Sequence, residues 1–313
     1  MITYHPAPVT VQQITYHGYT DALKLSNGLV EAVVVPQLGR VMRFQFAGQP
    51  QTSPLYEDAY WVGKTGVDAD MNAWANFGGD KAWPAPQSTW PERIGHTWPP
   101  DRAFDGSPYY AQTLPDGIRL TSPVSVPFAA RIVRSITLHP GQPRLYFVQS
   151  LVKDPQAPTP FPIGFWTITQ VRADSEVQIP AALAPGQIAP FQSLSDVGTT
   201  ETAPYYKIDG GLLKITHDPA KSHKISASPT PGVISLHYGP GLVFSEHYTS
   251  PPVGSSYAAY EQPTEVYSGA GTPGYFELEV LGPLLPLKAG ESAALPVYWE
   301  LTREKKQFRG VRK

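Results

Sequence analysis

Cysteine is absent from the 313-residue chain. Its absence excludes disulfides, thiolate metal sites and a cysteine nucleophile, but it does not identify a compartment, because secreted proteins can also lack cysteine. The N-terminal hexapeptide has neither a basic segment nor an apolar one, so we expect no signal peptide. The default expectation is a cytoplasmic protein.

Charge of one sign is equally scarce. Charged residues make up 16% of the chain, the formal net charge is −2, and residues 303–313 form the only basic cluster. We interpret this cluster as a solvated terminal tail. Nucleic-acid binding would require a basic stripe along the fold, and a membrane helix would require an apolar run of about 20 residues. The sequence has neither, so neither kind of partner is expected.

Motifs for metals and nucleotide cofactors are also missing. No two of the eight histidines have the spacing H-x-x-x-H or H-x-H. Nothing in the chain matches a G-x-S-x-G nucleophile elbow, a P-loop or a dinucleotide fingerprint that follows a strand. We therefore expect no metal and no cofactor.

Strand patterns are what the sequence does contain. Residues 29–35 form a β-branched run that ends at Pro36 and Gly39, and residues 131–138 largely alternate between polar and apolar. Helical periodicity is weak, and 35 prolines and 27 glycines divide the chain into short elements. Further strands are predicted at residues 41–46, 144–152, 163–171, 233–238, 242–247, 275–281 and 294–301. This pattern predicts an all-β fold, a large antiparallel β-sandwich. The length leaves open one oversized sandwich or two smaller β domains.

Residues 73–108 are the least strand-like part and hold four of the seven tryptophans. Tryptophan faces pack on the apolar side of sugar rings, while amide and charged side chains bind the hydroxyls. This combination favours a small-molecule carbohydrate. The alternative is a long surface loop whose aromatic side chains form a small core of their own. The candidate site residues in this segment are Asn76, Asp80, Lys81, Trp83, Gln87 and His96.

Two glutamates near the C-terminus form a second candidate group. Glu277 and Glu279 are two residues apart in a predicted strand, so both should point to one face of the sheet. Either carboxylate is a candidate general base, and the alternative is a pair of glutamates on a solvated face. His247 and His96 are candidates by neighbourhood only, with a structural or surface role as the alternative.

Several segments resemble the aldose 1-epimerase (galactose mutarotase) superfamily. Residues 33–48, with Pro36, Gly39 and Arg40, resemble its opening hairpin. Residues 276–279, 287–292 and 298–301 resemble its C-terminal Leu-Glu motif, its Leu-x-x-Gly-Glu turn and its final strand. Residues 76–87 resemble an uncharacterised bacterial branch of mutarotase-like proteins. The resemblance implies one β-supersandwich domain over residues 1–313, with a basic tail at about residues 303–313.

The resemblance also implies a chemistry. Mutarotases interconvert sugar anomers: a glutamate takes the proton of the C1 hydroxyl and a histidine protonates the ring oxygen. Glu279 matches the base of the Leu-Glu pair. Residues 165–170, which include Trp166 and Gln170, fall where the family carries an Asn-His motif, yet no histidine is there. The acid would then come from elsewhere, and the candidates are His96, Asp80, Lys81 and His247. Arg40 lies near a position where relatives place a basic substrate-binding residue.

Three functions remain open from the sequence. The first is an isomerase of the aldose 1-epimerase type with Glu279 as general base. The second is a non-catalytic carbohydrate-binding or sensing domain that uses the tryptophan-rich segment, with Glu277 and Glu279 as hydrogen-bond acceptors. Outside that segment, the candidate substrate-binding residues are Arg40, Trp166, Gln170, His247 and Glu277. The third is a structural sandwich that binds a partner through its aromatic loop, since tryptophan and arginine are enriched in interface hot spots.

Overall fold

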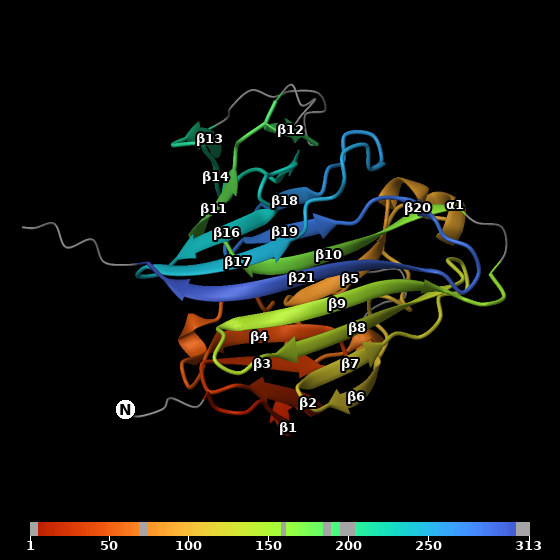
Figure 1. The fold of residues 1–313 in the computed structure, drawn as a ribbon, viewed down its shortest axis with the longest axis horizontal. Helices are drawn as coiled ribbons and strands as arrows, with labels where there is room; N and C mark the ends of the chain where they lie inside the picture. The colour runs from red at the N-terminus through yellow and green to blue at the C-terminus, as the bar shows by residue number, and fades with distance from the viewer. Residues whose placement is uncertain (1–5, 69–73, 158–160, 184–188, 195–203, 305–313) are drawn as a thin grey trace, which may run out of the picture.

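Three antiparallel sheets form the framework of the computed structural model, which describes residues 6–68, 74–157, 161–183, 189–194 and 204–304 (Figure 1). The predicted large antiparallel β-sandwich is confirmed. Residues 305–313, most of the predicted basic tail, lie outside the described residues. In the part of the chain that the structure describes, no helix has the length and apolar character needed to cross a membrane.

The first sheet is a four-stranded meander at the N-terminal end of the chain. Its order is β1 (Thr10–Tyr16), β2 (Tyr19–Ser26), β3 (Val30–Val35) and β4 (Arg40–Phe46). The turn between β3 and β4 is the one predicted from Pro36 and Gly39.

The second sheet has ten strands and runs across the molecule. Its order is β13 (Tyr206–Asp209), β14 (Leu212–Thr216), β11 (Ser175–Pro180), β16 (Val233–Tyr238), β17 (Leu242–Tyr248), β21 (Ser292–Arg303), β9 (Arg144–Lys153), β8 (Ala130–Leu138), β7 (Gly117–Thr121) and β6 (Tyr110–Leu114). Strands β8, β9, β16, β17 and β21 fall where the sequence predicts strands, at residues 131–138, 144–152, 233–238, 242–247 and 294–301.

The third sheet has seven strands and carries the candidate site. Its order is β12 (Phe191–Ser193), β15 (His223–Ala227), β18 (Thr264–Gly269), β19 (Tyr275–Leu281), β10 (Pro162–Arg172) and β20 (Leu285–Pro286), with β5 (Asp80–Ala85) paired to β10. The helical elements are short: α1 (Trp90–Ile94) and the 3-10 turns η1 (Pro50–Thr52), η2 (Gly66–Asp68) and η3 (Gln87–Thr89).

Strand β5 corrects the expectation that residues 73–108 are irregular. Pro84 lies inside it, and a proline is tolerated there because, in the described part of the chain, β5 pairs on one side only, with β10. Gly78, just before the strand, has φ +86°, and a Cβ on it would lie 2.2 Å from the Tyr56 carbonyl oxygen. The double glycine therefore lets the backbone pass close to residue 56 on its way into the strand.

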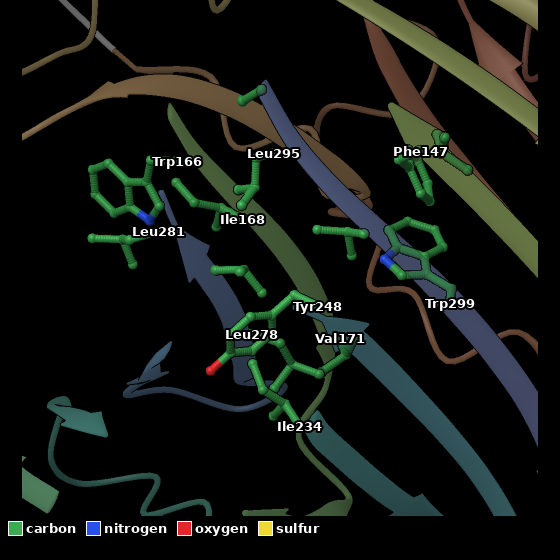
Figure 2. Close-up of a cluster of buried hydrophobic side chains, with 14 of the residues drawn as sticks. Phe147, Trp166, Ile168, Val171, Ile234, Tyr248, Leu278, Leu281, Leu295 and Trp299 are labelled. Atoms are coloured by element: carbon green, nitrogen blue, oxygen red, sulfur yellow. The ribbon is translucent and has the colours of Figure 1, made fainter. Parts of the chain in front are cut away.

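A large apolar cluster runs between the sheets, from Leu25 on β2 to Leu301 on β21, and a smaller one lies on the other face of the N-terminal sheet, around Val35 and Phe77. Figure 2 shows its centre, where Trp299 and Phe147 of the ten-stranded sheet pack near Leu278 and Val171 of the seven-stranded sheet. The Trp299 and Phe147 ring centroids are 4.6 Å apart. This contiguous core fixes the two large sheets against each other.

One acidic side chain lies inside this interior. Glu246 of β17 is fully buried. Burial, reinforced by the nearby Asp80 carboxylate, raises the pKa of Glu246 to about 8 from its usual value of 4.5. The folded protein therefore holds a proton on Glu246 over a pH range in which the unfolded chain has lost it.

We expect Glu246→Gln to flatten the pH dependence of stability. Because the folded-state pKa is raised, the stability that Glu246 contributes is fully present below about pH 4.5 and is lost as the pH rises to about 8. Wild-type stability should therefore fall relative to the glutamine variant by up to about 1.4 kcal/mol per pH unit in that window. Urea unfolding from pH 5 to 9 measures this, with the exposed-site variant Glu92→Gln as control. Parallel profiles for wild type and Glu246→Gln would contradict it.

Candidate functional site

A cavity of about 320 Å³ opens at the seven-stranded sheet. We call it the tryptophan cavity. Its volume is close to the lower end of the range for small-molecule sites, about 300–1,000 Å³. Its lining residues are Trp74, Trp83, Gln87, Trp98, Trp166, Lys224, Tyr267, Tyr275 and Glu277.

Strand register explains how residues so far apart in sequence meet here. Residues directly opposite each other in paired strands point to the same face of a sheet. One row across β10, β19, β18 and β15 is Gln170, Glu277, Tyr267 and Lys224. The neighbouring row across β5, β10, β19 and β18 is Lys81, Ile168, Glu279 and Glu265. As the spacing predicts, Glu277 and Glu279 share one face.

The aromatic wall is centred on Trp83, which is 2% exposed. Its ring centroid lies 5.3 Å from that of Trp166, 5.7 Å from that of Trp98 and 6.4 Å from that of Trp74, all in edge-to-face geometry. Such arrangements are favoured by the ring quadrupoles. Trp98 is the most open member, with 42% of its surface exposed.

Asp105 holds two tryptophans of this wall in place through hydrogen bonds to their indole N–H groups. Its Oδ2 accepts the indole N–H of Trp74 at 2.9 Å and that of Trp83 at 3.2 Å. Its Oδ1 accepts a hydrogen bond from the Arg40 guanidinium, which also donates to the Gly78 carbonyl oxygen at 2.6 Å. The orientation of two tryptophans therefore depends on one buried carboxylate.

A buried ion pair provides the polar base of the cavity. Lys81 Nζ donates to Glu277 Oε1 at 2.6 Å, and Gln170 Nε2 donates to the same oxygen at 2.9 Å. Within the described residues no hydrogen bond is made to Oε2 of Glu277, whose side chain is 13% exposed. Burial lowers the pKa of Lys81, while Glu277 opposes this shift. Glu277 thus has one oxygen held by Lys81 and Gln170, and its side chain lines the cavity.

A second charged group adjoins the first. Lys224 Nζ lies 2.6 Å from Glu265 Oε2 and 2.9 Å from Glu279 Oε2, and the Trp166 indole N–H donates to the same Glu279 oxygen at 2.7 Å. Burial raises the pKa of Glu279, and the Lys224 ammonium opposes this. Burial also disfavours the charged form of Lys224, but the two carboxylates outweigh it and raise the pKa of Lys224. Lys224 therefore stays protonated where it lines the cavity.

The structure brings together many of the residues predicted from sequence. Trp83, Gln87, Trp166 and Glu277 line the cavity. Lys81 and Gln170 each donate a hydrogen bond to Glu277. The predicted base Glu279 is not among the lining residues of the cavity: its side chain is 1% exposed, and it bonds to two residues that do line it, Trp166 and Lys224. Arg40 is likewise not a lining residue: its guanidinium donates a hydrogen bond to Asp105, which in turn binds the indoles of Trp74 and Trp83.

Other predicted residues lie elsewhere. Asp80 is on the opposite face of β5 from Lys81 because side chains alternate along a strand, and it forms a buried ion pair with Arg134. His247 is on β17 of the other large sheet, stacked on Tyr298 with ring centroids 4.4 Å apart. His96 is exposed in the turn after α1, and Asn76 precedes β5 outside the cavity lining. No histidine lines the cavity as the structure describes it.

Sequence reasoning missed Lys224, Glu265 and Tyr267, which β15 and β18 bring to the site. A faint signal was present, since Lys224 and Glu265 are charged residues within strands whose other residues are mostly buried. A charge in a buried strand must be paired. Among the residues that the structure describes, no group of three or more His, Asp or Glu side chains is arranged to hold a metal ion.

Solved structures of similar fold cover most of the chain. A galactose mutarotase-like protein from Lactobacillus casei matches with a TM-score of 0.56 and 12% identity over 90% of this chain and 100% of its own. A galactose mutarotase-like protein from Clostridium acetobutylicum matches with a TM-score of 0.56 and 10% identity, over 95% of this chain and 99% of its own. A protein from Klebsiella pneumoniae, assigned provisionally as an aldose 1-epimerase, matches with a TM-score of 0.61 and 9% identity, over 95% of this chain and 83% of its own.

At these identities the likeness shows the fold alone, and the fold is the galactose mutarotase-like sandwich that the end motifs implied. No curated protein sequence matches the chain. A family model matches residues 20–302, and the chain belongs to that family, described as Domain of unknown function (DUF4380).

Proposed function

We propose that the protein binds a carbohydrate in the tryptophan cavity. The observation that carries this proposal is the combination of four tryptophans and two tyrosines around a cavity into which a carboxylate, an ammonium and an amide converge. Aromatic faces pack on the C–H side of a sugar ring, and the convergent polar groups match its hydroxyls in direction.

The polar groups have complementary roles. Glu277 Oε2 accepts a hydrogen bond from a sugar hydroxyl, while Lys224 donates one. Because Lys81 and Gln170 hold the other oxygen of Glu277, the carboxylate is oriented before the ligand arrives. A preorganised acceptor of this kind reduces the entropic cost of binding.

The arrangement of the aromatics favours a small ligand over a protein partner. Trp83 and Trp166 are 2% and 5% exposed, so their faces are accessible only from within the cavity. A docking surface would present its aromatics outward, and in this wall Trp98 alone does so among the described residues. The mutarotase-like fold of the solved relatives also supports a sugar ligand.

Anomer exchange is a second candidate function. The observation that favours it is that Glu277 and Lys224 line the same cavity, which gives a base and a cation within one site. Glu277 takes the proton of the C1 hydroxyl, and Lys224 stabilises the charge that develops on the ring oxygen as the ring opens. In this proposal Glu277 contacts the ring, and Glu279 acts through Lys224.

Trp98→Ala should weaken sugar binding without unfolding the protein. Trp98 lines the cavity but is 42% exposed, so its removal takes away part of the wall at a small cost in stability. Titration of wild type with neutral hexoses should give a saturable change in tryptophan fluorescence. For the variant, the dissociation constant measured by calorimetry should rise about tenfold or more. Tyr60→Ala, which removes an aromatic that is 67% exposed and outside the cavity lining, is the matched control. Equal affinities in the three proteins would count against the site.

Anomer exchange of glucose and galactose, followed by NMR, separates the roles of the two glutamates. A general base contributes about 10²–10⁴-fold to a rate, so Glu277→Gln should lose at least 100-fold while Glu279→Gln keeps measurable exchange. Thermal unfolding of both variants checks that they are folded, because Glu277→Gln leaves the buried Lys81 ammonium without its counter-ion. The reverse order, with loss only in Glu279→Gln, would make Glu279 the base. No exchange by wild type would leave binding without catalysis.

A further inference from the structure

A second hollow adjoins the tryptophan cavity. We call it the second cleft, and its volume is about 380 Å³. The two share a wall: Tyr56 lines the second cleft, Tyr275 lines the tryptophan cavity, and their ring centroids are 5.1 Å apart. Gly274, the chain neighbour of Tyr275, also lines the second cleft. The lining residues are Tyr56, Arg172, Ala173, Asp174, His217, Pro219, Gly271, Thr272, Pro273 and Gly274.

The second cleft has the composition of a sugar subsite. The Tyr56 ring and two prolines, Pro219 and Pro273, provide apolar surface for the C–H face of a ring. At its rim Arg172 and Asp174 form an ion pair through two hydrogen bonds, with side chains 36% and 67% exposed. This planar pair offers donors and acceptors with no net charge, which suits a neutral, hydroxyl-rich ligand.

One wall of the second cleft is held in place by the backbone. The Gly271 N–H donates to the Pro219 carbonyl oxygen at 3.0 Å, and His217 Nε2 lies 3.1 Å from the Gly271 carbonyl oxygen. A Cβ on Gly274 would lie 2.2 Å from His217 Cε1, so only glycine allows this close approach. The turn that carries Thr272 and Pro273 is thus fixed against residues 217–219, and the cleft exists without a ligand.

We propose that the ligand is a neutral glycoside of at least two sugar units. The terminal ring occupies the tryptophan cavity, and the next unit crosses the edge of Tyr275 to pack on Tyr56 in the second cleft. The inference rests on the proposed function and deepens it, because it assigns the second cleft to the same ligand. The adjacency of the two hollows across the Tyr56–Tyr275 ring pair is the observation that carries it.

Calorimetry with sugars of increasing length tests the inference. The probes are glucose and galactose together with their di- and trisaccharides, in several linkages and both anomeric forms. For at least one linkage, we expect the disaccharide to bind about tenfold tighter than the monosaccharide, which corresponds to about 1.4 kcal/mol.

Thr272→Trp then assigns the gain to the second cleft. Thr272 is exposed and lines the second cleft but not the tryptophan cavity, so a tryptophan there fills the cleft and leaves the first ring's contacts intact. The variant should bind monosaccharides as wild type does and should lose the gain for longer sugars. Thr113→Trp is the matched control, because Thr113 is also exposed but lies on β6 at the far edge of the ten-stranded sheet.

The outcomes separate this inference from the proposed function. If monosaccharides bind and no longer sugar binds more tightly, the inference is overturned and the proposed function stands. A gain that survives Thr272→Trp also overturns it, because the second unit would then lie elsewhere. If no sugar of any length binds, the proposed function fails and the inference fails with it.

Discussion

The ion pair between Lys81 and Glu277 joins the two parts of the chain that make up the site. Both side chains are almost wholly enclosed, and an unpaired charge in such a place costs several kcal/mol. Among the described strands, β5, which carries Lys81, pairs with β10 alone, so its position depends on this contact and on the backbone ladder. On its other face, Asp80 pairs with Arg134 of the ten-stranded sheet. One short strand is thereby anchored by charge on both faces.

The aromatic wall follows from that anchoring. Trp83 is two residues beyond Lys81 on the same face of β5, and Asp105 fixes its indole together with that of Trp74. The protein's own cations already lie against these rings: Lys81 Nζ is 5.0 Å from the Trp83 ring centroid, and Lys224 Nζ is 4.8 Å from that of Trp166. The ring faces and ammonium groups thus form one preorganised surface.

The site departs from the histidine-based chemistry that the family resemblance implies. Trp166 and Gln170 stand on β10 near where a catalytic histidine is expected, and each donates a hydrogen bond to a glutamate of β19. Lys224 is the cation that lines the cavity, and no histidine is among the described lining residues. A lysine held between two carboxylates remains charged at neutral pH, whereas a histidine would titrate there. In the proposed anomer exchange Lys224 therefore stabilises charge without giving up a proton, while Glu277 acts as the base.

Sequence alone determined the fold class, because alternation of polar and apolar residues is a local property that reports on strands and their buried faces. It also singled out Trp83 and Lys81 in the tryptophan-rich segment and Glu277 in an alternating strand, and the structure places these three side chains close together. Tertiary structure decided the rest. Pairing across the three strands β15, β18 and β19 brought Lys224 and Glu265 beside Glu279, and no local pattern encodes which strands become neighbours. The same pairing buried Glu279 and left Glu277 facing the cavity, although spacing makes the two equivalent. Burial depends on what covers a face, and only the folded chain determines that.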